Sequence, residues 1–191
     1  DLMATLARQA REQGWATWLL SPDKDLYQLV DDSAPKVRGF HWHNRTVIDA
    51  DEVQARLGVP PSLAIDYFAL VGDSSDNVRG VRGIGPKAAS CLVSSLGNLS
   101  SIYSRLDEVS SLDIRGAKSL RAKLEEGKED AELALALVTL MDDIELELGS
   151  DLGQWSRWRG PGPEAGPLFE RFGVDAPMRA MGAIYAQRPS F

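Results

Sequence analysis

The sequence has 191 residues, a formal net charge of −7 at pH 7 and one cysteine, Cys91, which lies in an apolar run and is predicted to be a buried hydrophobe in a reducing compartment. A chain of this length buries about 70% of its unfolded surface, so folding needs no disulfide or structural metal. The acidic balance argues against a nucleic-acid partner, because polyphosphate binds basic surfaces, unless some carboxylates hold cations. Apolar runs such as "ALALVTL" are too short to cross a bilayer, and no secretory signal pattern opens the chain, so a soluble protein is expected.

Helix and strand signals alternate in the first third of the chain. Residues 1–14 place apolar side chains at helical spacing, and their first residue, an aspartate, is the expected N-cap. Residues 15–20, "WATWLL", predict a buried strand, and residues 25–32 predict a short helix. The alternating stretches 35–42 and 45–50 predict an edge hairpin. This order of elements predicts an α/β fold.

Beyond Asp49 the patterns are helical. The predicted helices cover residues 49–58, 60–72, 85–97, 98–109 and 116–140, and a closing helix covers 167–187. Between them, the segment 150–166 is rich in Gly, Pro and Trp and predicts a surface linker. We therefore divide the chain into three parts, 1–71, 72–148 and 149–191. Because it begins at Asp1 inside a helical pattern, we expect it to be a piece or a processed form of a longer protein.

Two loops carry paired aspartates. Asp23 and Asp25 follow the predicted strand, where open α/β sheets place their ligands. Asp73 and Asp76 follow a predicted helix and precede a glycine-rich turn. Each pair alone is compatible with a solvated turn. Two pairs on neighbouring loops, with Asp1 as a fifth acid, favour a Mg²⁺ site, because clustered carboxylates without cations raise one another's pKa and cost stability.

The stretch "VRGIGPKAA", residues 81–89, predicts a tight turn that leads into a helix. Gly83 and Gly85 permit close approach of the backbone, Pro86 suits the first helical turn, and Lys87 follows where free backbone N–H groups face outward. Such groups bind phosphate. The pattern favours a helix-hairpin-helix, which grips a nucleic-acid strand without reading its sequence. An ordinary turn between two helices is the alternative.

Three other patterns favour structural interpretations over functional ones. His41 and His43 share one side of a predicted strand, but no third zinc ligand lies near them in sequence, so surface histidines are expected. The basic run 115–123 is followed at once by acids and predicts a solvated helix face. Trp155 and Trp158 suit base stacking, although packing of the linker onto the core is preferred.

Three stretches together resemble a known family: "SPDKDLYQLV", "PPSLAIDYFALVGDSSDNVRGVRGIGPKAA" and "LALVTLMDDIELEL". They are similar to the 5′ nuclease domain of bacterial DNA polymerase I and to the wider family of flap endonucleases and phage 5′ exonucleases. The similarity runs from Asp1 to about Leu148, and "FERFGVDAPMRAM" looks like the family's final helix. It implies an α/β fold with the C-terminal part of a PIN-like 5′ nuclease core, followed by an all-helical helix-hairpin-helix (helix-three-turn-helix) region.

The resemblance also implies a function. Family members hydrolyse phosphodiester bonds of branched DNA near junctions of single and double strands, with two or more Mg²⁺ (or Mn²⁺) ions. The implied catalytic residues and metal ligands are Asp23, Asp25, Asp73 and Asp76, with Asp1 as a further ligand. A K⁺ ion is implied at the backbone carbonyls of Val78, Val81 and Ile84. The implied DNA contacts are Lys24, Arg79, Arg82, Gly83, Gly85, Lys87 and Ala88.

The family's N-terminal lobe, with its own acids and a helical arch, has no counterpart in this sequence. The expected partners are therefore branched or 5′-flap DNA, bound without sequence preference, and a separate lobe or larger assembly, with no membrane. A non-catalytic nucleic-acid-binding or scaffold protein derived from the family is the alternative to a nuclease. The expected location is the bacterial cytoplasm (nucleoid), or an organelle matrix for a eukaryotic source.

Overall fold

The computed structural model describes residues 1–114, 116–146 and 165–173. It divides the chain into two compact units, Asp1–Leu146 and Glu147–Phe191. Within the second unit, α9 (Ala165–Phe172) covers the first residues of the predicted closing helix. The remainder of that helix and the predicted linker, except its last two residues, lie outside the described residues. Among the helices of the described part, none combines the length and the apolar character that a membrane span requires.

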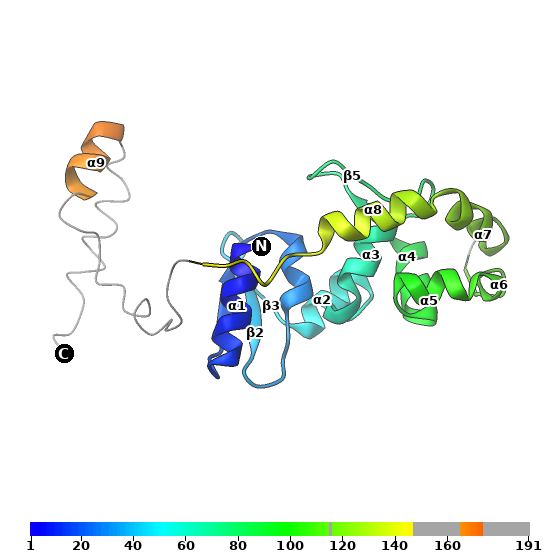
Figure 1. The fold of residues 1–191 in the computed structure, drawn as a ribbon, viewed down its shortest axis with the longest axis horizontal. Helices are drawn as coiled ribbons and strands as arrows, with labels where there is room; N and C mark the ends of the chain where they lie inside the picture. Colours follow the sequence, from blue (N-terminus) through cyan, green and yellow to red (C-terminus); the bar gives the residue numbers. More distant parts are fainter. Residues whose placement is uncertain (115, 147–164, 174–191) are drawn as a thin grey trace. The chain divides into compact units, whose positions relative to one another are not determined.

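The first unit opens with α1 (Leu2–Glu12) and a three-stranded sheet (Figure 1). β1 (Thr17–Leu20) pairs in parallel with β2 (Val37–His41), and β2 pairs antiparallel with β3 (Thr46–Ile48). The predicted short helix is the 3-10 helix η1 (Lys24–Leu29), which follows β1. The mixed α/β class and the hairpin of the second and third strands are confirmed.

The prediction of a buried strand over residues 15–20 is wrong about burial. β1 is an edge strand, and Trp18 and Leu20 are 52% and 63% exposed, whereas Leu19 is buried. Successive side chains of a strand point to opposite faces, so Trp18 and Leu20 share the face opposite Leu19. Leu19 packs in a small core with Ala7, Leu26 and Val37. The predicted strand is present, but only the face that carries Leu19 is buried.

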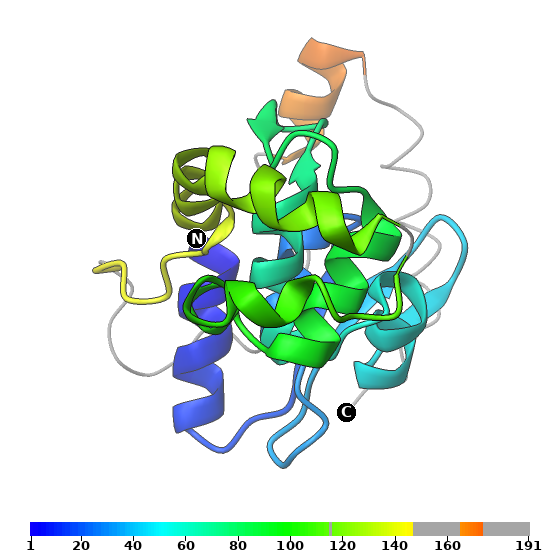
Figure 2. The same cartoon turned by 90° about the vertical axis from the view of Figure 1, so that its right-hand side faces the viewer.

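The rest of the first unit is mostly helical (Figures 1 and 2), and its helices hold most of the core. Its helices are α2 (Ala50–Leu57), η2 (Pro61–Leu63), α3 (Ala64–Val71), α4 (Pro86–Leu96), α5 (Leu99–Ser104), α6 (Leu106–Val109), α7 (Ala117–Glu126) and α8 (Lys128–Val138). α3 packs against both α4 and α8. The predicted helices 98–109 and 116–140 are each divided in two, at Arg105 and Gly127. A Cβ on Gly127 would lie 2.7 Å from Val81 Cγ1, so the break comes where the backbone passes close to a neighbouring segment.

A short hairpin stands in the loop that the sequence predicted between two helices. β4 (Gly72–Asp73) pairs antiparallel with β5 (Val78–Arg79). A Cβ on Gly72 would lie 2.4 Å from the Gly80 nitrogen, and one on Gly80 would lie 2.3 Å from the Gly72 nitrogen. Gly72 also has a φ of +78°. Glycine at both positions lets the two strands approach closely at the base of the hairpin. Asp73 lies on β4, and Asp76 lies in the turn between the two strands.

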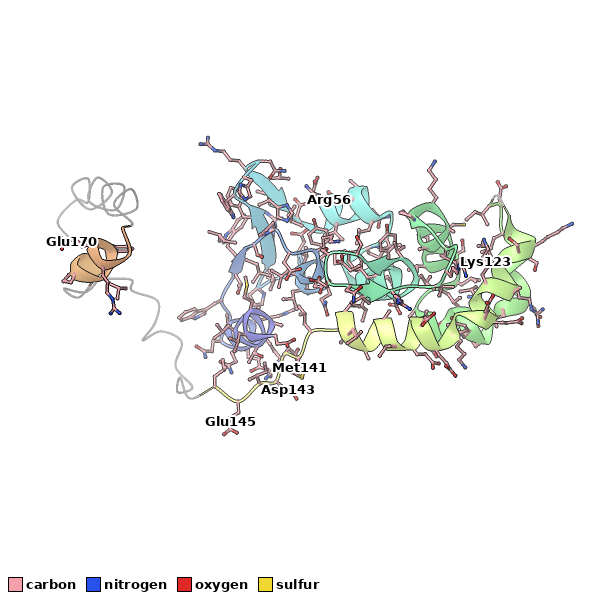
Figure 3. The ribbon with its side chains drawn as sticks, turned by 90° about the horizontal axis from the view of Figure 1, so that it is seen from above. Arg56, Lys123, Met141, Asp143, Glu145 and Glu170 are labelled. Atoms are coloured by element: carbon pink, nitrogen blue, oxygen red, sulfur yellow. The ribbon has the colours of Figure 1, made fainter. Side chains whose placement is uncertain are left out.

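After α8, residues 139–146 form an irregular stretch, here called the strap, which returns to the first elements of the chain. The Gln28 side-chain amide donates to the Val138 carbonyl (2.9 Å) and accepts from the Leu140 N–H (3.1 Å). Further along, the Ile144 N–H donates to Thr5 Oγ1 (3.3 Å) and Arg8 Nε donates to the Asp142 carbonyl (2.7 Å). Figure 3 labels Met141, Asp143 and Glu145 along the strap.

Candidate functional site

The first aspartate pair lies directly after β1. Asp23 precedes η1, and its Oδ1 accepts the Asp25 N–H (3.0 Å), while the Asp23 N–H donates to Ser21 Oγ (3.2 Å). These local bonds explain why the chain turns sharply here, since an aspartate that caps its own helix fixes the first turn. Asp23 is exposed and Asp25 is half-buried. The pair thus lies at the carboxyl end of the strand, as the sequence predicted.

Asp73 on β4 is the buried acid of the second pair, only 2% exposed. The Lys24 ammonium lies 2.8 Å from both of its carboxylate oxygens, and the Ser75 N–H donates to Oδ1 (2.9 Å). Burial raises the pKa of Asp73, but the bonds from Lys24 and Ser75 and the Lys24 charge together outweigh it and lower the pKa below its ordinary value. Asp73 is therefore held ionised, with a cation at its side.

Asp25 links the two pairs electrostatically. Burial, and then the charges of Asp23, Asp73 and Asp76, raise its pKa to about 6, against a smaller opposing effect of Lys24. Its buried Oδ1 has no hydrogen-bond partner among the described residues. The fold thus brings Asp23, Asp73 and Asp76 within electrostatic reach of Asp25. Asp73 Oδ2 also lacks a hydrogen-bond donor, although the Lys24 ammonium lies 2.8 Å from it.

The acid cluster, Asp23, Asp25, Asp73 and Asp76, has the chemistry of a hard-cation site. Carboxylate oxygens suit Mg²⁺, which binds through one or two carboxylates and keeps several waters. The buried Oδ1 of Asp25 has no hydrogen-bond partner among the described residues and is available to a cation, whereas both oxygens of Asp73 already contact the Lys24 ammonium. Within the part of the chain that the structure describes, no three acids or imidazoles converge closely enough to hold an ion by themselves. The residues present therefore fit a partial site.

Asp1 makes a different contact from the one predicted for it. It begins α1 but its side chain does not cap the helix. Instead, its Oδ1 accepts the Met141 N–H of the strap (2.8 Å). It is exposed, and it is not among the charges that raise the pKa of Asp25. A direct place for Asp1 in the metal site stays a prediction.

The glycine turn has the geometry that the sequence predicted. The Ile84 N–H donates to the Val81 carbonyl (3.0 Å), which closes the turn, and Gly83 has a φ of +80°. α4 begins with Pro86, and nothing lies within 4 Å of a Cβ built on Gly85. Gly85, Pro86 and Lys87 are exposed, so the start of α4 is open to solvent, and its first backbone N–H groups have no partner within the helix.

Cationic side chains surround this turn. Arg79, Arg82 and Lys87 are all exposed, and none of them makes an ion pair or a side-chain hydrogen bond to a described residue. The Val81 and Ile84 side chains are buried beneath the turn, 3% and 4% exposed. Apolar packing of Val81 and Ile84 thus holds the turn in place, and the positive charges of the exposed side chains face solvent.

Sequence reasoning missed one residue at this turn, Lys123 of α7. Its Nζ donates to the Gly83 carbonyl (3.1 Å), across 40 positions of the chain (Figure 3). The basic run 115–123 had been interpreted as a solvated helix face. That interpretation, made for most of the run, agrees with the exposed Lys118 and Arg121, whereas Lys123 is half-buried against the turn. No local pattern marks the difference, because it depends on where α7 meets the turn.

The two histidines have different surroundings, and His41 lines a small pocket together with Asp23. His41 stacks on Tyr27 with ring centroids 6.0 Å apart, and burial, followed by the charge of Arg56, lowers its pKa. His43 is exposed, next to Trp42 in the turn between β2 and β3. Neither belongs to a set of potential metal ligands among the described residues, so the structural interpretation is retained. Cys91 is half-buried rather than a core residue, while Trp155 and Trp158 lie outside the described residues.

A further cavity in the first unit is lined by none of the four aspartates of the acid cluster. It has a volume of about 470 Å³ and lies between α1 and the segment after η1. Its charged lining is already paired: Arg11 contacts Asp31 (2.6 Å), and Asp32 contacts Arg38 (2.6 Å). We therefore assign the candidate site to the acid cluster and the glycine turn.

Comparison with known proteins gives matches in sequence and in fold. Residues 59–160, more than half of the chain, match the family model described as 5′-3′ exonuclease, C-terminal SAM fold. DNA polymerase I of Pseudomonas aeruginosa is 41% identical over 152 residues, which cover 79% of this chain and 16% of that protein. Flap endonuclease Xni of Shewanella sediminis is 38% identical over 165 residues, which cover 86% of this chain and 59% of that protein.

Among solved structures, the T5 bacteriophage D15 flap endonuclease, in a complex with DNA and metal ions, matches with a TM-score of 0.60 and 26% identity. The match covers 72% of this chain and 48% of that one. The chain thus spans only part of the length of each of these proteins.

Proposed function

The chain belongs to the family of 5′-3′ exonucleases with a C-terminal SAM fold, and we propose that it takes part in metal-dependent hydrolysis of phosphodiester bonds in branched DNA, as a structure-specific 5′-to-3′ exonuclease or flap endonuclease. One observation carries the proposal. The charges of Asp23, Asp73 and Asp76 all act on the Asp25 carboxyl, so the two loops bring three further acids within electrostatic reach of Asp25. A scaffold has no need of acids that destabilise one another.

Asp23, Asp25, Asp73 and Asp76 would hold the ions, Mg²⁺ or Mn²⁺, with Asp1 as a proposed fifth ligand. When bound, two or more such ions activate the attacking water and stabilise the leaving oxygen. Lys24, half-exposed beside Asp73, would contact the phosphate that approaches the acids. Its salt bridge keeps Asp73 ionised and oriented before any ion arrives, which favours a preorganised site.

The glycine turn would hold the duplex part of the substrate. The open start of α4 offers the backbone of Gly83 and Gly85 and the N–H groups of Lys87 and Ala88 to phosphate. Arg79 and Arg82 would add contacts to the DNA backbone, without base readout. The proposed K⁺ ion would lie at the carbonyls of Val78, Val81 and Ile84 and would bridge the turn to a phosphate.

We also propose that a further lobe completes the nuclease, supplied by a longer protein or a larger assembly. The chain spans 48% of the matched T5 enzyme, which supports a substantial additional part. β1 offers a free edge to another strand, and Trp18 and Leu20 leave apolar surface beside that edge. On α8, Leu133 and Leu137 are each 60% exposed and present a second apolar patch for contact.

Such a protein would act on the nucleoid in the bacterial cytoplasm, or in an organelle matrix if the source is eukaryotic. The relatives reported above come from bacteria and a bacteriophage, which supports the first location. Imaging of a tagged chain in its own cell would test it, since a distribution that excludes the DNA would contradict the proposal.

The first test is Mg²⁺-dependent cleavage of a labelled 5′-flap duplex by this chain. The double variant Asp73→Asn, Asp76→Asn should lose about 100-fold or more of the cleavage rate, because it removes two carboxylate charges from the site. Asp130→Asn, which changes an exposed acid of α8, serves as the control and should cleave like the unchanged chain.

Two other results are informative. Cleavage that persists in the double variant would contradict the assignment of the acids. Duplex binding without cleavage by the unchanged chain would favour the non-catalytic alternative for this chain alone, and addition of the further lobe would then have to restore cleavage if the nuclease proposal is to stand.

A further inference from the structure

α7 and the glycine turn are fixed against each other by a shared core. Val81 and Ile84 under the turn belong to the same buried cluster as Leu120 and Leu124 of α7. At the end of α7, Gly127 lets the backbone pass so close to Val81 that a Cβ there would lie 2.7 Å from Val81 Cγ1. The distance between α7 and the turn is therefore set by packing, not by flexible surface contacts.

At this spacing the side chain of Lys123 reaches the turn. Its side chain lies over Gly83, where a Cβ would be 3.2 Å from both Lys123 Cε and Nζ. The ammonium donates to the Gly83 carbonyl (3.1 Å), which holds the charge at the edge of the turn. A lysine ammonium has three N–H donors. One is used here, and the described residues supply no acid that forms an ion pair with it.

We infer that Lys123 is a phosphate-binding residue, delivered to the glycine turn from α7, and that the Gly83 carbonyl positions its ammonium for this contact. The inference rests on the proposed function, because it assumes that the turn binds a duplex backbone. It adds a residue far along the chain to those of the turn itself. The φ of +80° favours glycine at position 83, and a methyl group there would also press against the end of the Lys123 side chain.

The test compares Lys123→Met with Lys118→Met. Both remove one positive charge from α7 and keep an unbranched stem, but Lys118 is exposed and makes no side-chain hydrogen bond or ion pair with a described residue. Affinity for a labelled 5′-flap duplex is measured over a range of KCl, with Ca²⁺ in place of Mg²⁺ to prevent cleavage. Lys123→Met should bind roughly three- to tenfold more weakly, and its slope of log affinity against log salt should fall by about one. Lys118→Met should change the slope little.

Three readouts separate the possible explanations. Lys123→Arg should restore most of the affinity and the salt slope, because a guanidinium also donates to a carbonyl and a phosphate. Weaker binding with an unchanged slope would overturn the inference and leave Lys123 a purely structural contact. Equal affinity and slope in the Lys123→Met and Lys118→Met variants would overturn it too.

The proposed function and this inference fail in different ways. If Lys87→Met weakens binding and Lys123→Met does not, the turn still binds DNA and only the inference is wrong. If the unchanged chain fails to bind the duplex at any salt concentration, the proposed role of the turn is wrong and the inference falls with it.

Discussion

Asp66 shows how one buried carboxylate joins two helices. It is 6% exposed on α3, and its Oδ1 accepts the Leu99 N–H at the start of α5 (2.7 Å). Burial raises its pKa, and the hydrogen bonds from the Leu99 and Asp66 N–H groups oppose this only in part. The Asp66 carboxylate thus stabilises the fold by accepting the Leu99 N–H, but burial of its charge is unfavourable.

Asp66→Asn should keep an oxygen that accepts the Leu99 N–H and should remove the cost of burying a charge. Asp66→Ala should lose about 1–3 kcal/mol of unfolding free energy, because it leaves the Leu99 N–H buried without an acceptor. Because the folded-state pKa of Asp66 is raised, its favourable contribution is fully present below the ordinary value of 3.8 and is lost as pH rises through the folded pKa. Urea unfolding from pH 3.8 to pH 7 should show the unchanged chain losing stability relative to Asp66→Asn. A constant difference would contradict this account.

At the scale of elements, two glycines of the segment 72–85 have opposite roles. Gly80 allows the close backbone contacts of the hairpin, because a Cβ would lie 2.3 Å from the Gly72 nitrogen and 2.4 Å from the Leu70 carbonyl oxygen. Gly85 has open space around it and a φ of −99°, which any residue tolerates. The sequence placed Gly85 in the glycine turn and gave no role to Gly80, whose close backbone contacts only the structure shows.

Gly80→Ala should accordingly lower the thermal midpoint by several degrees, since the backbone of the hairpin must shift. Gly85→Ala should leave the midpoint within about one degree of the unchanged chain and weaken duplex binding, because its methyl group would stand on the surface offered to phosphate. Differential scanning fluorimetry and the duplex assay test both variants. Equal midpoints for the two would refute the distinction.

At the scale of the whole first unit, Gln28 connects the end of α8 to η1. Its side-chain amide donates to the carbonyls of Val138 (2.9 Å) and Asp25 (2.7 Å) and accepts from the Leu140 N–H (3.1 Å). Val138 belongs to the main core, and Leu140 packs against the small core under the sheet. One side chain thereby joins the two cores and also touches the backbone of Asp25 in the acid cluster.

Gln28→Ala should destabilise the chain by about 1–3 kcal/mol, because it leaves backbone groups of the strap without their partner. It should also weaken the response of the acid cluster to Mg²⁺, measured as the shift in thermal midpoint on addition of the ion. Gln54→Ala, on α2, is the control. A variant with full stability would show that the strap is held by its other contacts alone.

The sequence by itself determined the family, the two aspartate pairs and the glycine turn, because these depend on residues close together in the chain and on backbone conformations that few residues allow. Only the tertiary structure decided that Trp18 and Leu20 lie on an open face, that Asp1 binds the strap, and that Lys123 reaches Gly83. Each of these depends on which elements meet across long stretches of chain. Packing of the whole core determines these long-range contacts, and no local sequence pattern predicts them.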